Sequence, residues 1–454
     1  MNQNVLFDKK FLSLLIIPLV AEQFLAMTIG ACDTLMVSSI GDAGISGVSL
    51  IDQFSQLMIQ LFAAFATGGA VVSSQYLGNR ETANASLAAK QLLNVALFTG
   101  LFVMAVCMPL RSQILGFLYG KSEKAVLEAA LAYFVWILAS FPFLAVYNSC
   151  AALFRSMGNS RLSLKVSVAM NLVNIAGNAI LIYGAKIGVI GAGISTLASR
   201  FVGAIIMVTL LCSKKNEIKI ERFWKLELNF PMIRRIFSVG IPSGIENSVF
   251  HIGKIFVQSF MSGFGTVAIA ANAISNTVAS FSNIPGNALG LASVTVIGRC
   301  IGAGEQKQAF FYGKKMMKIA YIAMFCTSSI IFLFAPIIVR AFKISPESIS
   351  LAVGVIRTCM VANVLFWPMS FTMPNILRAS GDVKFTMIVS NFSMWAFRVL
   401  FSFLISYFIL RRFPNSTSMA LYGVWFGMYL DWIFRGSLFF ARFKSGKWLE
   451  KKVI

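Results

Sequence analysis

Eleven ionisable side chains fall inside long apolar runs of this 454-residue chain, and they are the first candidates for chemistry. An ionised side chain near the centre of a lipid bilayer is costly, with estimates from about 3 to above 10 kcal/mol. Each one therefore needs a partner of opposite charge, a water-filled cavity or a functional role. The eleven are Glu22, Asp33, Asp52, Arg200, Glu246, His251, Lys254, Arg357, Arg398, Asp431 and Arg435.

Four polar residues of the first half fall at one depth. Asp33 and Asn178 each lie about six residues before the outer end of an outward-running segment, and Asn174 is one turn deeper than Asn178 on the same face. Thr196 lies about eight residues inside the next segment, so all four are ~9–15 Å below the outer surface. One carboxylate, two amides and a hydroxyl suit a Na⁺ site or a titratable aspartate. The Asn and Thr side chains could equally serve only to hold helices together.

The second half has no copy of this cluster, because Val257 stands at the position of Asp33 when the two halves are aligned. Its candidate polar site is instead Glu246, His251 and Lys254 on the seventh segment, of which the last two can share a helical face. His251 is the only histidine, and a lone histidine is more often a hydrogen-bonded core residue than a proton carrier.

Four further charged residues and one proline bear on how the segments work. Asp431 and Arg435 are four residues apart and are expected to neutralise each other on one helix. The sequence assigns no role to Asp52 or Arg398. Pro18 lies on the inner half of the first segment, where it removes a backbone hydrogen bond and favours a bend, so we interpret it as a conformational residue.

The amino-acid composition indicates what kind of protein holds these residues. The chain is 57% hydrophobic and 12% charged, with mean hydropathy +0.78, whereas soluble domains carry about 25% charged residues. This excludes a soluble enzyme, a disordered chain and a disulfide scaffold, and the seven cysteines, none in CxxC spacing, are expected to be buried free thiols. The formal charge of +22 would suggest nucleic acid on a soluble protein, but here it is typical of basic cytoplasmic loops.

The fold class predicted is an all-α membrane protein with twelve transmembrane helices in two six-helix bundles related by an internal repeat. Lys and Arg divide 26 to 8 between the two sides of such a protein, which predicts cytoplasmic termini in a multi-pass protein of the cell membrane. The predicted helices lie near 11–39, 43–77, 88–110, 124–150, 161–184, 188–212, 232–261, 265–298, 308–339, 347–376, 384–410 and 418–443.

A polar stretch near the middle divides the chain into an N-lobe at 1–213, a cytoplasmic linker at 214–230 and a C-lobe at 231–454. An offset of 224 residues pairs Pro18 with Pro242 and Glu22 with Glu246 without a gap. It also pairs loop glycines, whereas only ten of the 68 positions between 18 and 85 are identical. Because each half has an even helix count, the two repeats run in the same direction.

In these features the chain resembles the multidrug and toxic compound extrusion (MATE) transporters over essentially its whole length. The order and spacing of four groups of segments carry the resemblance. They are Pro18 with Asp33–Val37 and Gly41; Gln75–Gly78 with its repeat copy Gly302–Glu305; Leu153–Asn159 with its repeat copy Leu377–Asp382; and Asn174 to Asn178 followed by Gly188–Gly193.

The resemblance implies two six-helix lobes and export of organic, often cationic and amphipathic compounds in exchange for Na⁺ or H⁺. In the family an aspartate, two polar residues four apart and a threonine form the N-lobe cation site, at positions that match Asp33, Asn174, Asn178 and Thr196. The implied partners are small organic substrates and membrane lipids, with no nucleic acid. We expect a monomer with no cofactor and no metal other than Na⁺ at the coupling site.

Three other functions compete with this interpretation. A lipid-linked oligosaccharide or polysaccharide flippase of the same superfamily would line its cavity with arginines, and Arg200, Arg357 and Arg398 keep that alternative open. A major-facilitator transporter is disfavoured because its basic loop motif is absent after the second helix. A channel or membrane enzyme is a further class, although one histidine and no HExxH motif make an enzyme a poor fit.

Overall fold

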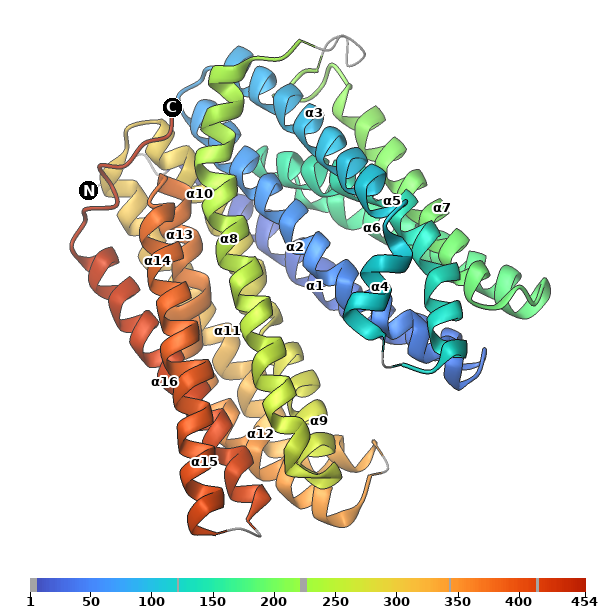
Figure 1. Cartoon of the computed structure of the whole chain (residues 1–454). Helices are drawn as coiled ribbons and strands as arrows, with labels where there is room; N and C mark the ends of the chain where they lie inside the picture. The colour runs from blue at the N-terminus through green and yellow to red at the C-terminus, as the bar shows by residue number, and fades with distance from the viewer. Residues whose placement is uncertain (1–5, 121, 221–226, 343, 414–415) are drawn as a thin grey trace. The chain divides into compact units, whose positions relative to one another are not determined.

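The computed structural model describes residues 6–120, 122–220, 227–342, 344–413 and 416–454, and all regular secondary structure within them is helical. Contacts divide the chain into two compact units, residues 7–244 and residues 245–453. Figure 1 shows the helices of the first unit in blue to green and those of the second in yellow to red. The lobe boundaries given above stay a prediction, and 221–226 of the predicted linker lie outside the described residues.

Helices of the first unit cover the first six predicted segments. The central helix α5 packs against α2, α3 and α7, and it buries Phe134 and Phe141 against Phe62 of α2. The elements are α1 (Lys9–Ser38), α2 (Asp42–Gly78), α3 (Thr82–Cys107), α4 (Arg111–Tyr119), α5 (Lys124–Ser156), α6 (Ser160–Asn178), the π-helical segment η1 (Ala179–Gly184) and α7 (Gly188–Leu211).

Helices of the second unit cover the remaining six segments, and α8 runs across the boundary between the units. In its core α12 packs against α9, α11 and α16. The elements are α8 (Phe230–Met261), the 3₁₀ turn η2 (Ser262–Phe264), α9 (Thr266–Ser282), α10 (Ile284–Gly302), α11 (Gln306–Arg340), α12 (Pro346–Trp367), π-helical η3 (Pro368–Thr372), α13 (Met373–Ser380), α14 (Val383–Ser393), π-helical η4 (Met394–Phe401), α15 (Ser402–Arg412) and α16 (Thr417–Lys444).

The predicted fold class is confirmed, with one correction to a helix. The single helix expected over 265–298 is wrong, because α9 ends at Ser282 and α10 begins at Ile284. Pro285 stands in the first turn of α10, where a missing N–H is tolerated, but it could not continue the hydrogen-bond ladder of α9.

Ten helical stretches of the described chain are long and apolar enough to cross a membrane by length and composition. Helices α8 and α16 are not among them, although each covers a predicted transmembrane segment. The reason lies in their polar residues, since α8 carries Glu246, His251 and Lys254 and α16 carries Asp431 and Arg435. These two helices therefore bring most of the second unit's intramembrane charge.

The same ion pair is built twice, once in each unit. In the first unit Arg155 lies 3.7 Å from Glu22, which also accepts a 2.7 Å hydrogen bond from Ser163. In the second unit Arg378 lies 2.6 Å from Glu246, which also accepts a 2.6 Å bond from a serine of α14. Both carboxylates are buried. In the first unit these contacts link α1 to α5 and α6, and in the second unit they link α8 to α13 and α14. In both repeats they therefore join the first transmembrane segment to the fourth and the fifth.

Candidate cation-binding site

The four predicted N-lobe residues lie on α1, α6 and α7 of the first unit. Helix α6 packs against α1 and α7, and a 2.6 Å hydrogen bond from Ser195 Oγ to the Asn174 carbonyl joins α7 to α6. Gly177 permits this approach, because a Cβ atom there would lie only 2.5 Å from Ser195 Oγ. Close packing at one glycine therefore sets the spacing of the polar side chains on both helices.

The structure brings the four residues together in two hydrogen-bonded pairs. The amide of Asn178 donates to Asp33 Oδ1, and the amide of Asn174 donates to Thr196 Oγ1 at 3.5 Å. Thr196 Oγ1 itself donates to the carbonyl of Ala192 at 2.9 Å. Their juxtaposition is observed, while their role in binding a cation stays a prediction.

One oxygen of this cluster is buried without a partner. Asn178 is 0% exposed, and its Oδ1 makes no hydrogen bond with any described residue. A buried polar atom without a hydrogen bond costs about 1–3 kcal/mol, so an orphaned carbonyl oxygen beside a carboxylate suggests a missing ligand. Sodium is a hard cation, and carboxylate, amide and hydroxyl oxygens are the ligands that hard cations take. A proton on Asp33 would also suit the site.

Three further residues surround the cluster. Tyr133 of α5 shares a side-chain hydrogen bond with Thr196, and the charges of Asp52 and Arg200 interact with that of Asp33. Arg200 also donates a 2.7 Å hydrogen bond to a serine of α5. Two carboxylates against one guanidinium leave this region with a formal charge of −1, which favours a cation.

Sequence reasoning found these surrounding residues only in part. It singled out Asp52 and Arg200 as charges inside apolar runs but gave them no place in the site. It missed Tyr133, and no signal in the sequence distinguishes this tyrosine from the other aromatic residues of α5. Pro18, the predicted conformational residue, is buried inside the continuous helix α1.

The candidate polar residues of the second unit lie in separate environments. Glu246 is held by Arg378, as described above, and the imidazole of His251 lies edge-on to the ring of Phe250 with centroids 6.4 Å apart. Lys254 makes no ion pair with any described residue and lines a small pocket. The structure thus places these three side chains in three environments on α8, and their role as one polar site stays a prediction.

Asp431 forms the predicted pair with Arg435, but a second arginine joins it. Asp431 Oδ2 lies 3.8 Å from Arg435 and 3.7 Å from Arg398, and its Oδ1 accepts a 2.6 Å hydrogen bond from Ser393. Sequence spacing predicted the partner on the same helix. It could not show that η4 carries Arg398 to the same carboxylate.

Comparison with known proteins gives the same picture over the whole chain. A family model described as MatE matches residues 18–180 and again residues 242–404, two segments 224 residues apart. The chain is 28% identical to the uncharacterized transporter YisQ of Bacillus subtilis over 96% of its length and 94% of the relative's. It is also 28% identical to the probable multidrug resistance protein NorM of Thermotoga maritima, over 98% of this chain and 94% of that relative.

A solved structure shares the fold. The crystal structure of a MATE protein in the bent conformation has a TM-score of 0.86 to this chain at 21% identity, covering 97% of this chain and 96% of that one. The two family-model segments reproduce the 224-residue offset read from the sequence.

Proposed function

The chain belongs to the MatE family of multidrug efflux transporters, and on that premise we propose that it is a secondary active antiporter of the cell membrane. It exports organic, cationic or amphipathic compounds in exchange for Na⁺ or H⁺ by alternating access. The observation that carries the coupling is the cluster of Asp33, Asn174, Asn178 and Thr196, with one buried amide oxygen left without a partner. Relatives named multidrug resistance proteins favour export over the flippase alternative.

Coupling needs no contact between the ion and the exported compound. A cation that binds one arrangement of the N-terminal unit more tightly than another shifts the population toward the first. A compound that prefers the other arrangement is then released, and the two bindings are linked by one free energy. Pro18 places a weak point in α1, the helix that carries Asp33, so a change in that helix can alter the site.

The test is transport in proteoliposomes with Na⁺ and H⁺ gradients imposed separately. Ethidium, a cationic amphipathic dye, is the probe, and its accumulation against its own gradient is measured by fluorescence. We expect one of the two gradients to drive accumulation in protein-containing vesicles and not in empty ones. Dye movement that follows only its own concentration gradient would contradict antiport.

A further inference from the structure

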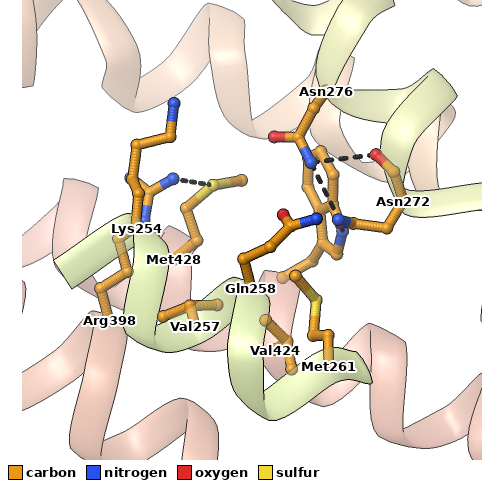
Figure 2. Close-up of a pocket in the computed structure, with 10 residues that line it drawn as sticks. Lys254, Val257, Gln258, Met261, Asn272, Asn276, Arg398, Val424 and Met428 are labelled. Atoms are coloured by element: carbon orange, nitrogen blue, oxygen red, sulfur yellow. Dashed lines mark hydrogen bonds between the residues drawn. The ribbon is translucent and has the colours of Figure 1, made fainter. Parts of the chain in front are cut away.

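A pocket in the second unit is lined by residues that have no part in the proposed cation coupling. It lies among α8, α9, η4 and α16 and has a volume of about 40 Å³. Figure 2 shows Lys254 and Arg398 at one end of it and the amides of Asn272 and Asn276 at the other, with Gln258 between them. The rest of its lining is Val257, Met261, Val424, Trp425 and Met428.

The charges at this pocket do not balance. Lys254 has no ion-pair partner in the part of the chain that the structure describes. Arg398 is only 11% exposed, and it shares the one carboxylate of Asp431 with Arg435. The Lys254 side chain is exposed, whereas Arg398 and Arg435 are largely buried around the single carboxylate of Asp431, where unpaired charge is expensive. Such an excess suggests a missing anion.

Hydrogen-bond donors of the pocket point to the same kind of ligand. Gln258 is an exposed residue one turn from Lys254 on the same face of α8, and its amide, which makes no hydrogen bond with any described residue, is free to donate. Arg398 has only a weak acceptor, the Met428 sulfur at 3.1 Å, for its Nη2. An oxygen acid would accept hydrogen bonds from the ammonium, the guanidinium and this amide.

The internal repeat shows how the second unit departs from the first. The 224-residue offset pairs Asp33 with Val257 and Asp52 with Asn276, so the two carboxylates in and beside the candidate cation site are replaced by uncharged residues here. The same offset pairs Gly30 with Lys254, which adds a cation. Corresponding positions thus carry net negative charge in the first unit and positive charge in the second.

We propose that this pocket binds an anionic oxygen group, a carboxylate or phosphate, of an amphipathic ligand. The volume suits one such group, and Val257, Met261 and Trp425 offer apolar surface beside it. A larger apolar hollow of about 580 Å³, lined by residues of α8, η4 and α15, also borders Val257. If the ligand is an exported compound, the proposal rests on the proposed function and identifies acidic compounds among its amphipathic substrates. If the ligand is not exported, the proposal is independent of that function.

A binding experiment tests the proposed anion site without any measurement of transport. Wild-type protein in phosphatidylcholine nanodiscs is titrated with dansyl-phenylalanine, which carries a carboxylate, and with its neutral amide. We expect the carboxylate to bind at least tenfold more tightly than the amide. Lys254→Gln should remove most of that preference and leave the affinity for the amide unchanged, whereas Lys254→Arg should retain it.

The matched control is Lys384→Gln, which removes the same charge from an exposed position of α14. Equal affinity for the two dansyl compounds, or equal losses in the Lys254 and Lys384 variants, would overturn the proposal. Retention of the preference by Lys254→Arg shows that the pocket is folded.

Nanodiscs containing phosphatidylglycerol distinguish the source of the anion. If the lipid competes with dansyl-phenylalanine in the wild type but not in Lys254→Gln, the ligand is a lipid headgroup; if it does not compete, the ligand is a free acid. Both outcomes support the pocket as an anion site. Failure of dansyl-phenylalanine to bind would leave ethidium antiport intact, so the two proposals fail separately.

Discussion

For Asn178, the position in the membrane expected from helical rise and the contact seen in the structure agree most directly. Its position one turn from Asn174 and at the level of Asp33 follows from helical rise alone, and the structure joins its amide to Asp33. Tyr133 could not be found in this way, because its contact with Thr196 depends on how α5 packs against α7. Spacing within one helix predicts a shared face, whereas contacts between helices depend on packing.

Asp33→Asn should abolish coupling while the protein still folds. The substitution keeps the shape and a polar group, but it removes the titratable carboxylate and the charge that would hold a cation. We expect ethidium to bind but not to accumulate on an imposed ion gradient. Purified variant in proteoliposomes is the measurement, and Asp42→Asn, at the exposed start of α2, is the control. Wild-type uphill transport by Asp33→Asn would show that the coupling group lies elsewhere.

Glu246→Gln should act on stability and leave the coupling stoichiometry unchanged. Its carboxylate lies 2.6 Å from Arg378 and is buried, and removing one partner of a buried pair costs about 3–5 kcal/mol. The readout is the thermal unfolding midpoint in detergent together with ions moved per dye molecule. Glu347→Gln, an exposed acid in the first turn of α12, should leave the midpoint unchanged. A stable Glu246 variant with altered stoichiometry would make this glutamate a coupling residue.

At the scale of elements, the sequence predicts where helices lie better than how they are interrupted. All twelve predicted segments fall on helices, because apolar runs and charged loops mark them. The π-helical segments η1 and η4 were not predictable, since a π turn leaves no pattern in apolar residues. Both bear on sites, because η1 follows Asn178 directly and η4 carries Arg398.

Pro18→Ala should slow transport more than it lowers expression. Alanine restores the missing backbone hydrogen bond of α1 and makes a bend in that helix less favourable. The expected result is a reduced rate of ethidium transport, with a thermal midpoint equal to or above the wild type. Pro336→Ala within α11 is the control, because that helix carries none of the proposed site residues. A normal rate for the Pro18 variant would remove its conformational role.

At the scale of the molecule, the internal repeat explains both what the halves share and how they differ. The paired glutamate–arginine contacts recur in both units because each repeat must tie its first helix to its fourth and fifth. The polar clusters do not recur, since Val257 and Asn276 replace two aspartates. The scaffold could be predicted from one half, but each polar cluster must be read from its own residues.

The distribution of basic residues predicts the orientation of the protein in the membrane. Lys and Arg divide 26 to 8 between the two sides, and positively charged loops stay in the cytoplasm. An epitope tag at either terminus should therefore be inaccessible to antibody on intact cells and become accessible after permeabilisation. The same tag inserted beside Lys186, in the short connection between η1 and α7, should be labelled on intact cells, because that connection lies on the side with few basic residues. Labelling of a terminal tag on intact cells, with the tag at Lys186 protected, would reverse the orientation and place Asp33 nearer the cytoplasmic surface.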